Sequence, residues 1–261
     1  MSDCASHCKS CPSTAGSWLR KGLQLAESDA VIALAGNPNT GKSTLFNHLT
    51  GLRQHTGNWP GKTIARADGA FAFRATRYRV VDLPGTYSLL SASPDEEVAR
   101  DFILFGGPDV TVVVADATAL ERNLNLVLQI LQITRKVVVA LNLMDEAAAH
   151  GLRVDARGLA RDLGVPVVPL VARRGEGIEL LIETIDSLRR DTIVCQPRAF
   201  HFPVPGIEDA VAELANDLLA LYPGLPQPRW IALRLLQGDS RIREALRAGD
   251  FELLTSSPKS P

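Results

Sequence analysis

A single loop constrains the fold of this 261-residue chain more than any other feature. Residues 36–43 read Gly-Asn-Pro-Asn-Thr-Gly-Lys-Ser, which fits the pattern G-x-x-x-x-G-K-[ST]. The apolar run before the loop predicts a strand and the stretch after it predicts a helix, the context that such a loop requires. Its glycines let the backbone wrap closely around phosphate oxygens, and the N–H groups of the helix N-terminus point at the same anion. The chain is therefore predicted to be a P-loop nucleotide-binding protein of the α/β class.

Strand and helix patterns alternate from residue 31 to residue 190. We predict six strands from short apolar runs, at residues 31–35, 69–73, 79–83, 110–115, 136–142 and 165–171. We predict five helices from helical patterns, at residues 42–51, 96–105, 121–134, 155–163 and 176–190. Continuously apolar strands that alternate with helices indicate a mostly parallel sheet covered on both faces. No helix separates the second and third strands, so one edge pair is expected to be antiparallel.

The character of the chain changes after this region. Prolines at positions 197, 203 and 205 indicate a linker, and helical patterns follow at residues 207–221, 229–236 and 240–248. We predict a flexible Cys-containing extension at residues 1–29, with a short helix near 18–27, and an α/β domain at residues 30–192. A helical domain at residues 193–250 and a disordered tail at residues 251–261 are predicted to follow. The predicted fold is thus a mixed six-stranded sheet flanked by helices, with a small all-helical C-terminal domain.

The phosphate end of the predicted site combines the loop with the end of the third strand. Lys42 is expected to reach the β- and γ-phosphates, and Ser43 to place its hydroxyl on Mg²⁺. Asp82 can hold Mg²⁺ through water, and Gly85 can bring its N–H to the γ-phosphate. The predicted nucleotide contacts here are Gly36, Asn37, Pro38, Asn39, Thr40, Gly41, Lys42, Ser43, Thr44, Asp82, Leu83, Pro84 and Gly85.

The base end of the site is predicted from Asn-Leu-Met-Asp at the end of the fifth strand. The Asp145 carboxylate can accept both the N1–H and the 2-amino group of guanine, a donor pair that adenine lacks, so it selects guanine. Asn142 is expected to brace the loop and approach the base, while Leu143 replaces a lysine stem and Met144 completes the motif. Backbone N–H groups of a later loop are expected to contact the guanine oxygen, at Val171, Ala172 and Arg173.

A switch segment is predicted between the first helix and the second strand. Thr63 is expected to bring its hydroxyl to Mg²⁺ only when the γ-phosphate is present, with Gly61 and Lys62 beside the nucleotide. Thr56 is the competing candidate for this role. The predicted Mg²⁺ ligands are Ser43, Thr63 and Asp82.

Hydrolysis is predicted to be slow because Thr86, and not Gln, follows Gly85. In Ras-type enzymes a Gln in this place orients the attacking water. Asn39 offers another device, since in a subset of GTPases an Asn at this position helps to bind K⁺, which acts much as an arginine finger would. The alternative is that Asn39 only caps or tightens the loop. The predicted catalytic residues are Lys42, Thr63, Gly85 and Asn39.

Taken together, these stretches resemble one family. The chain is similar to the N-terminal cytosolic part of FeoB, the bacterial ferrous iron transporter family, in Gly-Asn-Trp-Pro-Gly-Lys-Thr at 57–63, Asp-Leu-Pro-Gly-Thr-Tyr-Ser at 82–88 and Ala-Leu-Asn-Leu-Met-Asp at 140–145. Asp116 and Glu-Arg-Asn-Leu at 121–124 also fit, and the similarity runs from about residue 30 to residue 240. It implies a Ras-like P-loop GTPase domain followed by a helical domain that acts like a GDP-dissociation inhibitor.

The resemblance also implies a role, ligands and partners. The implied role is GTP-regulated Fe²⁺ uptake across the inner membrane, and from the residues above we predict that the module binds GTP and GDP, depends on Mg²⁺ and is stimulated by K⁺. The implied partners are a membrane permease domain of the same polypeptide, small cytosolic accessory proteins of the ferrous iron system, and further copies in a homo-oligomeric transporter. No permease follows Pro261, so we expect a soluble fragment, the cytoplasmic domain of a bacterial inner-membrane protein. The alternative is a tRNA-modification or ribosome-assembly GTPase, which shares the Ras-like core.

The composition argues against a GTPase that acts on RNA, but it does not decide the role of the N-terminal cysteines. The formal net charge is −1, so the chain lacks the basic surplus of a nucleic-acid-binding protein. No apolar run approaches the roughly 18 residues of a membrane-spanning helix. Three thiols and an imidazole lie near the N-terminus, at Cys4, His7, Cys8 and Cys11. One interpretation is that they bind Fe²⁺ or Zn²⁺, which these ligands suit. The other is that they belong to a disordered tail with reducible thiols. A metal-binding sensor built on these side chains is a third hypothesis.

Overall fold

The computed structural model describes residues 29–51, 54–59, 62–90, 93–198, 206–225, 227–247, 249 and 251. These residues fall into two compact units, which divide between residues 201 and 202. Several sequence predictions lie outside the described residues, namely the helix near 18–27, the tail from residue 252, Gly61, and the possible metal ligands Cys4, His7, Cys8 and Cys11.

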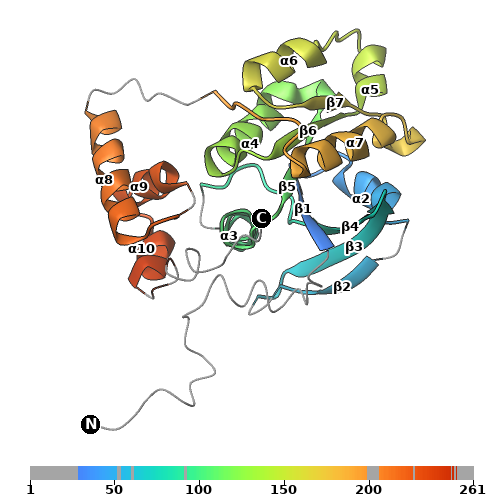
Figure 1. The fold of residues 1–261 in the computed structure, drawn as a ribbon. Coiled ribbons are helices and arrows are strands. Elements are labelled where there is room, and N and C mark those ends of the chain that lie inside the picture. Colours follow the sequence, from blue (N-terminus) through green and yellow to red (C-terminus); the bar gives the residue numbers. More distant parts are fainter. Residues whose placement is uncertain are drawn as a thin grey trace. The chain divides into compact units, whose positions relative to one another are not determined.

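A seven-stranded mixed sheet forms the centre of the first unit, in the strand order β2-β3-β4-β1-β5-β6-β7 (Figure 1). The strands are β1 (Asp29–Gly36), β2 (Gln54–Asn58), β3 (Ala65–Phe73), β4 (Thr76–Asp82), β5 (Val110–Asp116), β6 (Val137–Asn142) and β7 (Val167–Pro169). The five strands from β4 to β7 in this order run parallel, and β3 pairs antiparallel with both β2 and β4. The predicted α/β class and mixed sheet are therefore confirmed.

The prediction of six strands was wrong, because β2 adds a seventh at the edge of the sheet. Its sequence, Gln-His-Thr-Gly-Asn, is polar and has no apolar alternation, so the pattern that revealed the other strands is missing. The strand instead forms through main-chain pairing with β3, from Gln54 opposite Gly69 to Asn58 opposite Ala65. The strands β3 and β4 pair antiparallel as predicted, but β2 and not β3 is the edge strand of the sheet.

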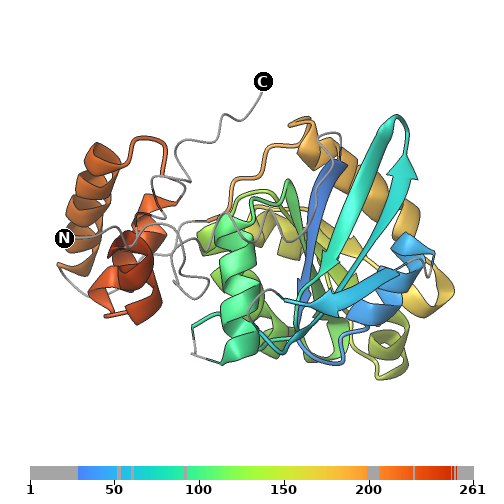
Figure 2. The same cartoon turned by 90° about the horizontal axis from the view of Figure 1, so that it is seen from below.

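Helices cover both faces of the sheet. They are α2 (Lys42–Thr50), α3 (Pro94–Phe105), α4 (Leu120–Ile133), α5 (Met144–Ala149), α6 (Ala156–Leu163) and α7 (Ile178–Arg189), with short 3₁₀ turns η1 (Ala117–Ala119) and η2 (Ala172–Arg174). Figure 2 shows α3 on the opposite side of the sheet from α2 and α7. The short helix α5 was not predicted from the sequence, because its six residues give too little periodicity.

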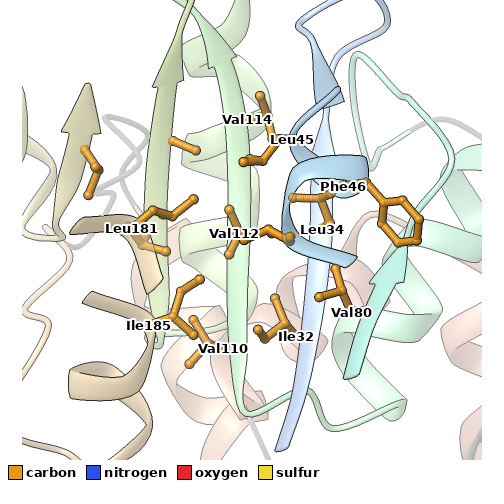
Figure 3. Close-up of a cluster of buried hydrophobic side chains, with 14 of the residues drawn as sticks. Ile32, Leu34, Leu45, Phe46, Val80, Val110, Val112, Val114, Leu181 and Ile185 are labelled. Carbon is orange, nitrogen blue, oxygen red and sulfur yellow. The ribbon is translucent and has the colours of Figure 1, made fainter. Parts of the chain in front are cut away.

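Alternation along the strands divides the core between the two faces. Every second residue of the central strands points towards α2 and α7, as Ile32 and Leu34 of β1 do (Figure 3). Leu45 and Phe46 of α2 meet this layer, which is completed by Val80, Val110, Val112, Val114, Leu181 and Ile185. This packing fixes the position of α2, and with it the loop that opens the helix.

The second unit contains three helices in its described residues, α8 (Ile207–Leu221), α9 (Pro228–Leu236) and α10 (Ser240–Arg247). Val211 and Leu218 of α8 are buried, as are Trp230 and Ile231 of α9, in agreement with the apolar spacing of the sequence. The predicted helical C-terminal region is therefore confirmed. None of the helices in the described part of the chain has the length and apolar character needed to cross a membrane.

Candidate functional site

The predicted site residues gather where neighbouring parallel strands end. β1 ends at Gly36, β4 at Asp82 and β6 at Asn142. The register brings Gly36 opposite Val114 of β5, and Asn142 opposite the last residue of the same strand, Asp116. Ligands of open α/β sheets bind in the crevice outside such carboxyl ends, so the fold presents these residues where a ligand would sit.

The phosphate loop depends on two close backbone approaches. Gly41 has φ +82°, and a Cβ at this residue would lie 2.3 Å from Asn142 Nδ2. A Cβ at Gly36 would lie 2.7 Å from the carbonyl oxygen of Val114. Both positions therefore require glycine for steric reasons that a pattern match only implies. Within the loop, the Thr40 hydroxyl donates a hydrogen bond of 2.9 Å to the carbonyl of Asn37.

Lys42 and Asp82 form an ion pair at the phosphate end. Lys42 Nζ donates a hydrogen bond to Asp82 Oδ1, and the two side chains are only 11% and 18% exposed. Burial raises the pKa of the Asp82 carboxyl above its usual range, and the charge and hydrogen bond of Lys42 offset part of that increase. The pair joins the first turn of α2 to the end of β4, so the expected phosphate ligand and the expected metal ligand are neighbours.

The donors near this pair fit Mg²⁺. Ser43, exposed beside Lys42, offers a hydroxyl oxygen, and Asp82 offers a carboxylate oxygen. Hard oxygen donors of this kind suit Mg²⁺, which is commonly held by one or two protein oxygens together with phosphate oxygens and water. Among the described residues, no group of three or more His, Cys, Asp and Glu side chains could hold a metal ion.

The predicted switch segment between β2 and β3 is anchored to α3. Trp59 is 1% exposed and meets Phe102 edge to face, with ring centroids 5.5 Å apart. Lys62, which was expected beside the nucleotide, places Nζ 2.6 Å from Glu97 Oε2 of α3. Thr63 is exposed next to it. The competing candidate Thr56 lies within β2, where it pairs with Ala67 of β3.

The loop between β4 and α3 is held by contacts that the sequence did not reveal. The N–H of Thr86 donates to the carbonyl of Gly36 over 3.2 Å, which ties this loop to the phosphate loop. Gln129 of α4 accepts two hydrogen bonds through Oε1, from the Leu89 N–H at 2.6 Å and from the Ser88 hydroxyl at 3.2 Å. A glutamine inside an amphipathic helix carries no sequence signal of such a role, because surface glutamines are common in helices.

A cation–π contact adds to this attachment. The Arg122 guanidinium of α4 lies 4.0 Å from the centre of the Tyr87 ring. Arg122 falls in the segment 121–124 that entered the family resemblance without an assigned role. The structure thus gives that segment a physical function, which is to hold the loop that follows Asp82.

Asn142 links the two ends of the site. Its side chain is buried, its Nδ2 donates to the Thr40 carbonyl at 2.9 Å, and its Oδ1 accepts the Ala172 N–H at 2.9 Å. One carboxamide therefore joins the phosphate loop to the η2 turn, as its predicted bracing role requires. Because the Ala172 N–H donates to Asn142 Oδ1, it is no longer available to the guanine oxygen, for which it was predicted. The Val171 N–H donates to the Glu176 carbonyl at 3.1 Å, so of the three predicted amides only that of Arg173 is left as the candidate donor.

Asp145 is the second residue of α5, and the residue that caps this helix, Leu143, has φ +62°. Its Oδ2 accepts a hydrogen bond from Arg173 Nη2, and Arg174 Nη2 is 3.7 Å away. Burial acts to raise the pKa of Asp145, but the hydrogen bond and charge of Arg173, together with backbone N–H groups of Asp145 and Glu146, outweigh it, so the pKa lies below its usual range. Asp145 is therefore an ionised acceptor at neutral pH, as its predicted base-reading role requires.

Asn39 occupies the exposed tip of the phosphate loop in a left-handed conformation, with φ +65°. Asn tolerates this conformation better than most residues, so the bland role of shaping the loop is consistent with the geometry. Its carboxamide oxygen is also a hard donor of the kind that alkali cations accept.

Family models match most of the chain. A model described as Ferrous iron transport protein B matches residues 30–185, and one described as FeoB cytosolic helical domain matches residues 205–257. The Fe(2+) transporter FeoB of Salmonella typhimurium is 44% identical over 212 residues, which cover 80% of this chain and 27% of that protein. The chain therefore spans about a quarter of the length of the curated relatives that it matches.

Solved structures extend the similarity to the backbone. The cytosolic domain of the T. maritima FeoB iron transporter in a GDP form has a TM-score of 0.75 and 35% identity, over 86% of this chain and 91% of that chain. The GMPPNP form of the same domain has a TM-score of 0.76 and 35% identity, over 89% of this chain and 88% of that chain. Relatives of the same fold have thus been solved in a GDP form and in a GMPPNP form.

Proposed function

The chain belongs to the ferrous iron transport protein B (FeoB) family, and on this premise we propose that it is the GTP-binding and GTP-hydrolysing module of a ferrous iron membrane transporter. The observation that carries the proposal is the double hydrogen bond of Asn142, at 2.9 Å to Thr40 and 2.9 Å to Ala172. It couples a phosphate loop to a turn beside Asp145, so the two ends of one guanine nucleotide site are held in register. The permease to which this module would signal is a proposal drawn from the full-length relatives.

Asp145 is proposed to select the base. Its carboxylate is held in the first turn of α5, and its lowered pKa keeps it ionised, so it can accept the N1–H and 2-amino group of guanine together. Adenine offers no such donor pair. The amide of Arg173 is the proposed donor to the guanine oxygen, since Asn142 already accepts the Ala172 amide.

Lys42, Ser43 and Asp82 are proposed to act on the phosphates. Mg²⁺ would supply charge neutralisation between the β- and γ-phosphates when bound. Lys42 would exchange part of its bond to Asp82 for phosphate oxygens, and the freed carboxylate, together with the Ser43 hydroxyl, would hold Mg²⁺. Thr63 is proposed to join this set when the segment between β2 and β3 moves, which would make that segment and the loop after Asp82 the GTP-dependent switches.

Hydrolysis is proposed to be slow and to depend on K⁺. Thr86 stands where a water-orienting Gln would be, and it is 4% exposed with its N–H bound to Gly36. Such a side chain is too short and too enclosed to position water beyond the phosphate loop. Asn39, exposed at the loop tip, is the proposed K⁺ ligand that compensates in part.

The base-reading proposal is tested by exchanging the acceptor pattern at residue 145. Asp145→Asn presents one acceptor and one donor, which suits xanthine because xanthine carries an oxygen in place of the 2-amino group. We expect this variant to lose at least about tenfold in GTP affinity, or 1.4 kcal/mol, and to prefer XTP over GTP in a competition assay. If it still prefers GTP, Asp145 does not read the base.

The K⁺ proposal has its own measurement. GTP turnover is compared in KCl and NaCl at equal ionic strength, for the wild type and for Asn39→Ala. We expect faster turnover in K⁺ for the wild type only. Equal rates of the wild type in both salts would exclude the K⁺ role without touching the assignment of the base.

A further inference from the structure

Two arginines of the η2 turn converge on the carboxylate that is proposed to read guanine. Arg173 Nη2 donates to Asp145 Oδ2, and Arg173 Nη1 also lies 3.8 Å from Glu146 Oε1. Arg174 Nη2 approaches the same Asp145 oxygen at 3.7 Å. The Asp145 side chain is 11% exposed, whereas both arginine side chains are 57% exposed. A nearly enclosed anion is thus paired with cations that reach it from solvent.

The backbone around this cluster is held by hydrogen bonds, whereas the arginine side chains extend into solvent and are 57% exposed. The η2 turn is fixed at its start by the Ala172 N–H on Asn142, and it ends at Gly175 with φ +74°. Asp145 is carried by the first turn of α5, whose Leu143 carbonyl accepts the Ala147 N–H at 3.0 Å. The long arginine side chain is therefore the part of the pair that can leave without any backbone change.

Guanine needs both oxygens of the carboxylate. Its N1–H and 2-amino group are parallel donors, and a carboxylate accepts them as a bidentate pair. Within the described part of the chain, Asp145 Oδ1 is buried without a hydrogen-bond partner, while Oδ2 is taken by Arg173. Arg173 occupies one acceptor position of Oδ2 and offsets part of the charge of the carboxylate, so the guanidinium and the base compete for the same group.

We propose that the Arg173 guanidinium is an internal competitor of the guanine base for Asp145, which lowers the affinity for guanine nucleotides and speeds their release. The inference rests on the proposed base-reading role of Asp145. Arg174 is a weaker second competitor, since it lies farther from the same oxygen. The expected size is modest, because a solvent-exposed arginine in an ion pair changes an affinity by about two- to fivefold.

The competition makes a prediction that depends on the nucleotide. Arg173→Ala should tighten GDP and GTP binding by about two- to fivefold, chiefly through a slower dissociation rate. It should leave ADP and ATP affinity within experimental error of the matched control, because adenine does not use Asp145. Dissociation of a fluorescent GDP analogue by stopped flow and titration calorimetry with the four nucleotides measure both effects.

Arg161→Ala is the matched control, since it also removes one exposed positive charge, and that side chain pairs with Asp162 in α6. A general electrostatic effect on anionic nucleotides would appear equally in this variant. Introducing Arg173→Ala into an Asp145→Ala background should have no further effect on GDP affinity, because the competed group is gone. Thermal unfolding of each variant checks that the substitutions leave the fold intact.

The possible outcomes separate the two proposals. A wild type that binds GDP no better than ADP refutes base reading by Asp145 itself. If the wild type prefers GDP and Arg173→Ala binds GDP as weakly as the wild type, or more weakly, the competition is overturned. If Arg173→Ala binds GDP more weakly than the wild type, Arg173 instead contributes to nucleotide binding.

Discussion

The two loops that flank the phosphate loop are attached to neighbouring helices by different physical means. The loop between β2 and β3 rests on α3 through the buried ring of Trp59 against Phe102, with a Lys62–Glu97 ion pair at 2.6 Å beside it. The loop between β4 and α3 is attached to α4 through hydrogen bonds to Gln129. It is also tied to the phosphate loop by the Thr86 N–H.

The apolar attachment of the loop between β2 and β3 can adjust its geometry, whereas the hydrogen-bonded attachment of the loop between β4 and α3 cannot. Apolar contact is non-directional, so Trp59 can shift against Phe102 while it remains buried. A buried hydrogen bond has a narrow geometry, and the Leu89 N–H would lose its partner if the loop slid along α4. We therefore infer that the loop between β2 and β3 tolerates larger displacements, and that the loop after Asp82 changes position only together with its hydrogen bonds.

Removing the apolar anchor should have the largest effect on stability. Trp59→Ala leaves a cavity against Phe102, and we expect the free energy of unfolding to fall by about 3–5 kcal/mol. Trp59→Phe keeps most of the buried ring and should recover most of that loss. Urea unfolding measures both variants, and a loss below about 1 kcal/mol for Trp59→Ala would show that this loop is not anchored by its tryptophan.

Removing the hydrogen-bonded anchor should have an intermediate effect. Gln129→Leu leaves the Leu89 N–H buried without its acceptor, and we expect a loss of about 1–3 kcal/mol in the free energy of unfolding. Hydrogen exchange at Leu89 should accelerate in the same variant. Gln132→Ala, on the same helix, is the matched control and should stay within about 0.5 kcal/mol of the wild type. Similar losses in both variants would assign the effect to α4 as a whole.

The ion pair of the first loop should contribute less than either anchor. The Lys62 and Glu97 side chains are each 20% exposed, so we expect Lys62→Ala to cost about 0.5–1 kcal/mol. Exchanging the charges with Lys62→Glu and Glu97→Lys together should restore stability that each single reversal loses. If the double variant loses as much free energy of unfolding as the two single variants together, Lys62 and Glu97 do not pair directly.

The smallest expected effect is a pH dependence at Asp82, because Lys42 offsets part of the cost of its burial. The folded pKa of Asp82 is raised, so the folded state binds more protons than the unfolded state between the unfolded and folded pKa values. The contribution of Asp82 to stability is therefore highest below this window and falls as the pH rises through it. Asp82→Asn should remove this component from the stability–pH profile, measured without nucleotide or Mg²⁺. An unchanged profile would contradict the raised pKa.

Most of the candidate site could be predicted because its signals are local. The phosphate loop, Asp82 and the segment 142–145 are short stretches whose spacing follows from strand–loop–helix geometry. The strands β1, β5 and β6 were found because each is almost continuously apolar, as Val110–Asp116 is over nearly its whole length. The strand β2 was missed because edge strands that pair through the main chain need no apolar pattern.

The sequence by itself determined the class of fold, the loop at Gly36 that is proposed to bind phosphate, the helical C-terminal region and the family. Only the tertiary structure decided which side chains meet across long separations. Asn142 spans 102 residues to Thr40, Gln129 spans 40 to Leu89, and Arg173 spans 28 to Asp145. The physical reason is that periodicity and spacing encode contacts within a few residues, whereas these pairs depend on how helices and strands pack. The loop at Gly36 is visible in the sequence, but the hydrogen bonds of Asn142 that join it to the turn beside Asp145 exist only in the folded chain.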